Sequence, residues 1–562
     1  MESRVCRICR KNFEITDEDL VFYKKFEVPE PLRCPSCRLM RRLAERNTHN
    51  LYWRKCDLTG EKTLSWYNEK TPFPVYSTSS WWSDKWDGLD YGRDFDFSRP
   101  FFEQFAELKN CVPHVALYII NNTLENSDYT NCTGYLKNCY LIFESDYDED
   151  CYYSNLLKHC KNMVDCSICY DSELCYECIN CLNCYNLKYS RDCRQCQNSF
   201  ALVDCQACEN CIGCINQRHK SYMIFNKQYS AEEYAKLKTG FALDIKNGAG
   251  KLLQKCEEFF KTQPHKALQA EQNENSLGDH LYNSKNSQYC FDSKDLEDCR
   301  YCARLSLNIK NSMDYNSWGD NAELVYESAS CGHHIYNVKF CTTCETDFRD
   351  CEYCMQCNAS NNLFGCIGLK KKSYCILNKQ YTREEYEKLR AKIIEHMKQA
   401  ASPRGERAGE RGSGFASPSD AELINKEYGE FFPASMCPFG YNETIAMDYF
   451  PLTREEALAQ GYQWKEPDEL EIKVSTKEIL TCGDCKRNFK LIPQELKFYK
   501  DLKIPEPEKC FHCRYADRMK KINPYKIWDR ACAKCKAEIK TTYSPNAPEI
   551  VYCKDCYLKA IY

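Results

Sequence analysis

The sequence lacks the features that define several large classes of protein. No run of 18 apolar residues occurs among its 562 residues, and the first segment, MESRVCRICRKNFE, has no apolar stretch typical of a secretory signal. It has only ten histidines and contains no glycine-rich phosphate loop, no HExxH and no GxSxG. We therefore expect neither a membrane protein nor an enzyme built on one of these common sites.

Cysteine, by contrast, is abundant, with 43 residues alongside 40 tyrosines. Disulfide-rich chains are typically small and secreted, and this chain is neither, so we expect it in the reducing cytoplasm. In that compartment CxxC pairs bind metal more often than they are oxidised. The net charge of -4 argues against a uniformly basic nucleic-acid-binding protein, and 43% hydrophobic residues are enough for several domain cores.

The two ends of the chain are copies of each other at an offset of 476 residues, without a gap. Each copy has two CxxC pairs, which supply four thiolates, the ligand set of a closed structural zinc site. A third set of two pairs follows the C-terminal copy. We predict about three zinc ions per chain. The predicted ligands are Cys6, Cys9, Cys34, Cys37, Cys482, Cys485, Cys510, Cys513, Cys532, Cys535, Cys553 and Cys556.

Further residues are shared by the two terminal copies. They are an aromatic residue after the first pair, a Phe-Tyr pair, a Pro-Glu-Pro and an arginine directly after the second pair: Phe13 and Phe489, Phe22-Tyr23 and Phe498-Tyr499, Arg38 and Arg514. With these features, roughly 40 residues at each end resemble the treble-clef "probable zinc-ribbon" domain family of bacteria. The whole chain also resembles uncharacterised Cys-rich zinc-ribbon proteins of uncultured bacteria. The resemblance implies a fold and a metal, and it implies no activity.

The N-terminal copy of the third set keeps a single cysteine. Cys56 aligns with Cys532, but Thr59, Ser77 and Ser80 take the other three positions. One thiol cannot hold a structural zinc, so we expect a metal-free remnant of a zinc ribbon. Large aromatic side chains are expected to form its core instead. They are Trp66, Trp81, Trp82 and Trp86.

Positively charged segments of helical character follow the second CxxC pair at each end, and residues 481–562 carry 18 Lys and Arg against 10 Asp and Glu. A cationic helix near aromatic residues can bind phosphate by charge and bases by stacking. The other interpretation is a solvated helix face that balances thiolate charge. The candidate nucleic-acid-binding residues are Arg38, Arg41, Arg42, Arg514, Arg518, Lys520 and Lys521.

The middle of the chain is repetitive. From Cys139 to Cys214 every cysteine lies in one register modulo three, and the tract can be written as nine units of nine residues. A short fixed period is typical of a solenoid, and two units would form an 18-residue coil. Leu157, Leu187 and Leu202 replace cysteine at repeated positions, which favours a ladder of reduced core thiols. Ligation of zinc or iron-sulfur by a subset such as Cys175, Cys178, Cys181 and Cys184, or disulfides, stay open as alternatives.

A second cysteine-rich tract repeats the first, because residues 221–237 return as 373–389 at an offset of 152. Its cysteines change register more than once, which predicts bulges or loops. A capping box, Ser230 with Glu233 and Thr382 with Glu385, predicts a helix after each tract.

The predicted fold is therefore mainly β, with two cysteine-rich β-solenoid tracts, helical caps and terminal treble-clef and zinc-ribbon modules. The expected segments are a treble clef (1–52), a ribbon remnant (53–110), solenoid copy 1 (111–228), a helical connector (229–277), solenoid copy 2 (278–380), a capping helix (381–400), a flexible linker (401–422), a small α/β segment (423–475), a second treble clef (476–522) and a zinc ribbon (523–562).

These expectations favour a non-enzymatic zinc-binding structural or interaction protein. We expect its terminal modules to bind a nucleic acid, a ribonucleoprotein or another protein, with no membrane and no small-molecule substrate. The alternative is a thiol-rich metal-binding or redox protein that uses the central cysteines.

Overall fold

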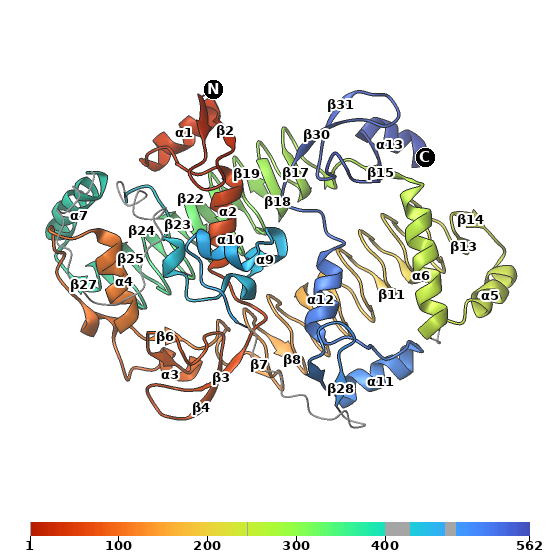
Figure 1. Cartoon of the computed structure of the whole chain (residues 1–562), viewed down its shortest axis with the longest axis horizontal. Coiled ribbons are helices and arrows are strands. Elements are labelled where there is room, and N and C mark those ends of the chain that lie inside the picture. The colour runs from red at the N-terminus through yellow and green to blue at the C-terminus, as the bar shows by residue number, and fades with distance from the viewer. Residues whose placement is uncertain (1, 244–245, 400–426, 467–478, 562) are drawn as a thin grey trace. The chain divides into compact units, whose positions relative to one another are not determined.

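The computed structural model describes residues 2–243, 246–399, 427–466 and 479–561 (Figure 1). The chain divides into two units, of which unit 1 comprises Met1–Leu117 and Leu268–Glu466, and unit 2 comprises Tyr118–Ala267 and Pro467–Tyr562. Each unit thus combines one cysteine-rich tract with the CxxC-containing segment from the far end of the chain. The predicted fold class is confirmed, because both tracts wind into parallel β-coils. The predicted flexible linker, 401–422, lies outside the described residues.

Each regular coil has four sides, and each side is one triplet of residues. In unit 2 parallel bridges join residues that are four triplets apart, such as Tyr140 with Tyr152 and Tyr152 with Val164. Every third residue from Asn126 to Asn210 has a φ of 45–62°, which turns the chain at a corner. Asn and Asp tolerate this left-handed conformation better than most residues, and they are frequent at the corners.

The predicted 18-residue coil is therefore wrong. One left-handed residue in each triplet makes a corner, and four corners close the coil after four triplets rather than six. Because all four sides use the same inward residue types, the sequence shows the length of a side but not the number of sides. The predicted repeat unit spans three sides.

The inward residue of most triplets is cysteine, and the prediction of stacked core thiols is confirmed. The cysteines from Cys139 to Cys214 are all at most 2% exposed. The Cys166 thiol donates to the carbonyl oxygens of Val164 at 3.4 Å and Cys175 at 3.5 Å, and neighbouring thiols repeat this pattern. Serine fits the same position, since the Ser154 hydroxyl accepts from the Cys166 amide at 3.0 Å. All 43 cysteines are among the described residues, and none is in a disulfide.

The solenoid of unit 2 is built mostly of short strands and isolated bridges, and an antiparallel hairpin ends it. Its strands are β7 (Leu124–Glu125), β8 (Leu136–Lys137), β9 (Asn155–Lys158), β10 (Ser167–Tyr170), β11 (Tyr185–Lys188) and β12 (Gln197–Phe200), and the hairpin is β13 (Met223–Ile224) with β14 (Lys227–Gln228).

The solenoid of unit 1 has longer strands, and its coils are of three lengths. The first coil is one residue shorter than a coil of unit 2 and joins Ala270 to Leu281. A coil of the same length as in unit 2 joins Cys351 to Leu363, and a coil one residue longer joins Val325 to Val338. Each added residue gives a corner with two successive left-handed residues, so the register changes are one-residue corner insertions. These corners are Leu307-Asn308, Ser317-Trp318, His333-His334 and Thr346-Asp347.

The strands of unit 1 form two parallel sheets along the coils, one of β16 to β18 and one of β19 to β27, in which only the closing strand β27 is antiparallel. They are β16 (Ala270–Glu271), β17 (Leu277–Tyr282), β18 (Gln288–Lys294), β19 (Leu296–Glu297), β20 (Ile309–Lys310), β21 (Met313–Asn316), β22 (Ala322–Ala329), β23 (Tyr336–Lys339), β24 (Arg349–Glu352), β25 (Asn361–Phe364), β26 (Ser373–Ile376) and β27 (Lys379–Gln380).

Helices cover the ends of the coils. The two predicted capping boxes are confirmed at α5 (Ala231–Gly240) and α7 (Arg383–Lys398). In unit 2 the coils also pack on α6 (Lys246–Lys261), which buries Leu252, Cys256 and Phe260. In unit 1 the corresponding cover is α4 (Phe101–Cys111), whose phenylalanines lie in the main apolar cluster. These helices protect the last coil from pairing with other strands.

The terminal modules consist of short antiparallel hairpins followed by helices. In unit 1 they are β1 (Glu2–Val5), β2 (Asn12–Ile15), α1 (Asp17–Phe26), α2 (Pro35–Ala44), β3 (Tyr52–Lys55), β4 (Lys62–Ser65), β5 (Val75–Tyr76) and α3 (Thr78–Trp82). In unit 2 they are β28 (Leu480–Thr481), β29 (Asn488–Phe489), α11 (Pro493–Leu502), α12 (Phe511–Met519), β30 (Trp528–Ala531), β31 (Glu538–Thr541), β32 (Ile550–Tyr552) and α13 (Lys554–Ile561).

Each ribbon is joined to the rest of its unit by parallel strand pairing. β5 pairs with β6 (His114–Val115), and β32 pairs with β15 (Pro264–Lys266). Unit 1 also contains η1 (Gly88–Tyr91), η3 (Ala434–Met436), η4 (Tyr441–Glu443), α9 (Ile445–Tyr449) and α10 (Arg454–Ala459).

Candidate metal centres and their basic helices

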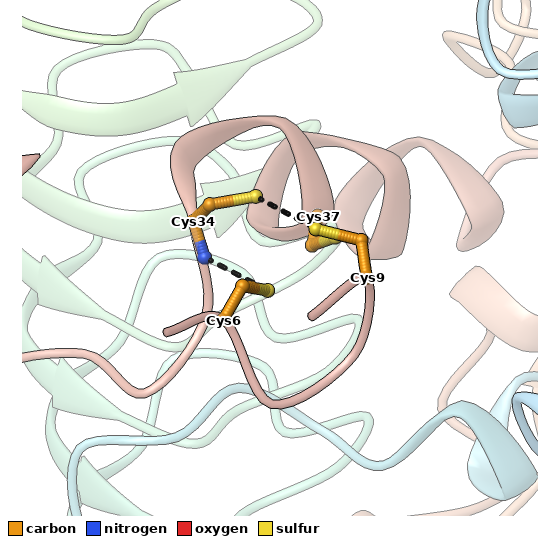
Figure 2. A group of neighbouring side chains, drawn as sticks. All are labelled: Cys6, Cys9, Cys34 and Cys37. Atoms are coloured by element: carbon orange, nitrogen blue, oxygen red, sulfur yellow. Dashed lines mark hydrogen bonds between the residues drawn. The ribbon is translucent and has the colours of Figure 1, made fainter. Parts of the chain in front are cut away.

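The structure brings the twelve predicted ligands together in three groups of four. Within each group the four Sγ atoms lie within 4.8 Å of one another, so each group could hold a metal ion. Figure 2 shows one group, in which Cys6 and Cys9 from the first hairpin face Cys34 and Cys37 at the start of α2. In the described part of the chain, no comparable group forms among the solenoid thiols.

The three groups share one backbone design. In each hairpin a left-handed residue after the first pair turns the chain, with φ of 59°, 61° and 64° at Arg10, Lys486 and Lys536. The amide of the third cysteine then donates to the sulfur of the first. These contacts are Cys34 to Cys6 at 3.3 Å, Cys510 to Cys482 at 3.2 Å and Cys553 to Cys532 at 3.3 Å.

The spacing of the sulfur atoms fits a small tetrahedral ion. A zinc-sulfur distance of about 2.3 Å places the corners of a tetrahedron about 3.8 Å apart. One contact between the two pairs in each group measures 3.8, 3.6 and 3.8 Å: Cys9 to Cys34, Cys485 to Cys510 and Cys535 to Cys553. The residues present therefore fit a four-thiolate metal site.

The thiol of the first cysteine in each group has a lowered pKa. Burial opposes ionisation of Cys482, but backbone amides, that of Cys510 foremost, outweigh it and lower its pKa to about 6. The pKa of Cys532 is also lowered to about 6 by amides against the effect of burial. Burial and the nearby sulfur of Cys485 raise the pKa of Cys510 to about 11. A bound cation would be needed to ionise all four thiols near neutral pH.

The N-terminal ribbon remnant keeps the shape of such a site around its single thiol. Gly60 is left-handed at φ 74°, and the Ser77 amide donates to the Cys56 sulfur at 3.3 Å, as in the three complete groups. Burial is outweighed by the Thr59 hydroxyl and backbone amides, which lower the pKa of Cys56 to about 7. As expected, tryptophans pack nearby, with Trp81 and Trp86 buried and their rings 5.6 Å apart.

The arginines of the basic helix α2 in unit 1 are buried and form ion pairs with carboxylates of the solenoid. Arg38 and Arg42 are at most 1% exposed. Arg42 forms ion pairs with Asp314 at 3.2 Å and Glu327 at 3.0 Å, and its Nε donates to Asn316 at 2.8 Å. The Nε of Arg38 donates to Asp314 at 2.8 Å.

Arg41 belongs to the same buried network. It is 2% exposed and forms ion pairs with Glu327 at 3.1 Å and with Glu430 at 2.9 Å. The carboxylate of Glu430 comes from the described segment 427–466, so this segment helps hold α2 on the coils.

The basic helix α12 of unit 2 makes the corresponding contacts with the other solenoid, and in Figure 1 it lies along the coils of residues 118–224. Arg518 is fully buried, pairs with Asp165 at 2.9 Å and Glu177 at 3.7 Å, and donates from Nε to Ser167 at 3.2 Å. Arg514 pairs with Asp165 at 2.9 Å.

Neither interpretation of these arginines made from the sequence describes their position. A buried guanidinium in contact with carboxylates can reach neither phosphate nor solvent. The structure gives an internal role to Arg38, Arg41, Arg42, Arg514 and Arg518, which attach each module to a solenoid. Lys520 and Lys521 are exposed at the end of α12, so phosphate binding stays a prediction for these two residues.

The acidic partners of the arginines were missed by sequence reasoning. Asp165 and Asp314 are corner residues with φ of 55° and 54°, and Asp is common at such corners for conformational reasons alone. A signal was present in the duplication, because a charged residue recurs at the same coil position in both tracts.

Comparisons with known proteins add no assignment. No family model matches the chain, and no curated protein matches it. A solved structure described as that of an acetyltransferase from Desulfovibrio desulfuricans G20 is 9% identical and covers 45% of this chain and 71% of its own, with a TM-score of 0.11. A likeness at that score carries no argument about fold or activity. Among the described helices, none has the length and apolarity needed to cross a membrane.

Proposed function

We propose that the protein is a zinc-binding interaction protein in which each of the three cysteine groups holds one structural zinc ion. The observation that carries this proposal is the convergence of twelve cysteines in three sets of four, with sulfur contacts of 3.6 to 3.8 Å. Four protein ligands leave no open position on zinc, so the ion would act on structure rather than on a substrate.

Zinc would stabilise the modules in a direct way. In each group the first pair lies in a hairpin and the second pair lies at the start of a helix, so one ion would join these two elements. When bound, zinc neutralises part of the thiolate charge and holds the four sulfurs together. The modules then present their helices to the solenoids, and the solenoids form a core without metal.

Metal analysis of the purified protein tests this proposal. We expect about three zinc ions per chain and no iron-sulfur absorbance. Cys513→Ser and Cys535→Ser should each remove about one equivalent, whereas Cys178→Ser in the solenoid should remove none. More than three metal ions per chain, or loss of metal from Cys178→Ser, would instead support a metal-binding role for the central thiols.

The exposed lysines of unit 2 support nucleic acid as the partner class. Lys520 and Lys521 are exposed directly after α12, and Lys534, Lys536 and Lys554 are exposed beside the third cysteine group. Lysines that contact phosphate release counterions, so the binding constant falls with salt, by a slope of about 0.7 to 0.9 per contact. Lys520→Ala/Lys521→Ala should lower this slope by up to about 2.

Lys236→Ala, on the exposed face of α5, is the matched control and should leave the salt slope unchanged. Binding would be measured with single-stranded RNA and duplex DNA over a range of salt. Wild-type protein without salt-dependent binding to either probe would remove nucleic acid from the proposal.

A further inference from the structure

The attachment of α2 in unit 1 and of α12 in unit 2 is one contact that occurs twice. Arg42 and Arg518 correspond at the offset of 476 that relates the two modules. Asp314 and Asp165 correspond along the solenoids at an offset of 149. The segments that follow the two tracts, 221–237 and 373–389, are offset by 152 residues. Three one-residue corner insertions lie between Asp314 and Ser373, so the offset at Asp314 is smaller by three.

The surroundings of the two aspartates also match. Each site has the corner aspartate, a polar residue two positions later, a glutamate on the next coil and a tyrosine on the preceding coil. We call these sets the arginine sites: Tyr301, Asp314, Asn316 and Glu327 in unit 1, and Tyr153, Asp165, Ser167 and Glu177 in unit 2. The first arginine of each helix lies over the tyrosine ring, at 5.6 Å for Arg38 and 4.8 Å for Arg514.

The same arginines also contact the backbone of the candidate metal centre. Arg38 directly follows the ligand Cys37, and its Nη1 donates at 2.7 Å to the carbonyl oxygen of Arg33, the residue before the ligand Cys34. The equivalent bond joins Arg514 to the carbonyl of Lys509 at 3.1 Å. One guanidinium therefore connects the cysteine loop to the solenoid carboxylate.

From this arrangement we infer that each solenoid carries a receptor site for the arginine helix of a metal-loaded module, and that metal binding and docking are coupled. The inference rests on the proposed binding of metal by the cysteine groups. Bound metal fixes the first turn of the helix, where the N-cap and the third residue are ligands, and so it fixes the arginines that follow. Loss of metal would release the helix and expose the arginine site, whose carboxylates fit the guanidinium groups of an arginine-bearing helix.

Coupling is reciprocal, so the solenoid acids must influence the metal centres. Asp165 lies in a different tract of the sequence from Cys510. Even so, it acts on that centre indirectly: Asp165 pairs with Arg514, and Arg514 donates to the carbonyl oxygen of Lys509, the residue before Cys510. Removal of such partners commonly weakens metal binding by about 10- to 100-fold. Asp165 should affect the group containing Cys482, Asp314 should affect the group containing Cys6, and each should leave the other two groups unchanged.

The test uses the full-length, metal-loaded chain and the variants Asp165→Asn and Asp314→Asn. A chromogenic chelator would report metal release, and alkylation followed by mass spectrometry would identify the thiols exposed. We expect Asp165→Asn to accelerate release from the group containing Cys482 by about 10-fold or more. Asp314→Asn should do the same for the group containing Cys6. Asp171→Asn, at an exposed corner of the unit 2 solenoid, is the control and should match wild type.

Release at the wild-type rate from both aspartate variants would overturn the inference, as would equal acceleration at all three groups, because that indicates general unfolding. Should either variant fail to fold, Ser167→Ala removes one hydrogen bond to Arg518 and should accelerate release from the Cys482 group a few-fold. An unchanged rate in that variant would also count against coupling. Wild-type protein that contains no metal would refute the proposed function rather than the coupling.

Discussion

Replacement of Arg518 with methionine gives a quantitative test of the buried ion pairs. Arg518 is fully buried, and its guanidinium contacts Asp165 at 2.9 Å, Ser167 at 3.2 Å and the carbonyl oxygen of Tyr153 at 3.2 Å. Methionine fills much of the volume but leaves Asp165 buried with only Arg514 as a cationic partner. Removal of one member of a buried pair costs about 3 to 5 kcal/mol, and we expect about 3 kcal/mol because Arg514 remains.

Hydrogen exchange of individual peptides, measured over a range of urea concentrations, would report the loss of unfolding free energy separately in each unit. We expect faster exchange in peptides from residues 139–214 and unchanged exchange in peptides from 282–376. The double variant Arg518→Met/Asp165→Asn removes both charges, so it should recover part of the loss, with a coupling of about 1 to 3 kcal/mol. Lys520→Ala, whose side chain is 75% exposed, should cost less than about 0.5 kcal/mol. A loss below about 1 kcal/mol for Arg518→Met, or strict additivity in the double variant, would refute the reasoning.

Other predictions concern thiols, core packing and pH. Metal-loaded native protein should show one fast-reacting thiol, because Cys111 is the one exposed cysteine outside the metal groups; Cys111→Ser should abolish that reaction. Leu187→Ala, in the core of the unit 2 solenoid, should cost about 2 to 5 kcal/mol in urea unfolding, and a loss below this range would contradict close packing of the core. Burial and then Lys109 lower the pKa of His114 to about 3. As the pH falls, His114 is therefore protonated in the unfolded chain before it is protonated in the folded protein. The free energy of unfolding should decrease between about pH 6.5 and pH 3, by up to about 1.4 kcal/mol per pH unit. His114→Gln should flatten that slope, and an unchanged slope would refute the assignment.

The metal groups and the period of the solenoid could be read from the sequence because both depend on local relations. A CxxC pair brings two sulfurs together within one turn, and the sequence separation of Cys9 and Cys34 recurs unchanged between Cys485 and Cys510. The triplet register of the cysteines follows from one inward residue on each side of a coil. The capping boxes at Ser230 and Thr382 are equally local, as is the change of register at each corner insertion.

The number of sides in a coil and the use of the arginines could not be read in this way. Coil closure depends on the sum of four corner angles, and each triplet contains the same kinds of residue whichever side it occupies. The contact of Arg38 with Asp314 spans 276 residues, and that of Arg518 with Asp165 spans 353. Charge alone does not distinguish an arginine that faces solvent from one that meets a carboxylate so far along the chain.

The sequence by itself thus determined the cysteine groups that could hold metal, the β-solenoid class and the duplication. Only the tertiary structure decided that each terminal module docks on the solenoid encoded farther from it, and that the basic helices are buried. The physical reason is that each cysteine group and each coil forms within a short segment of the chain. A buried ion pair instead forms only where folding brings two distant charges together and removes both from water.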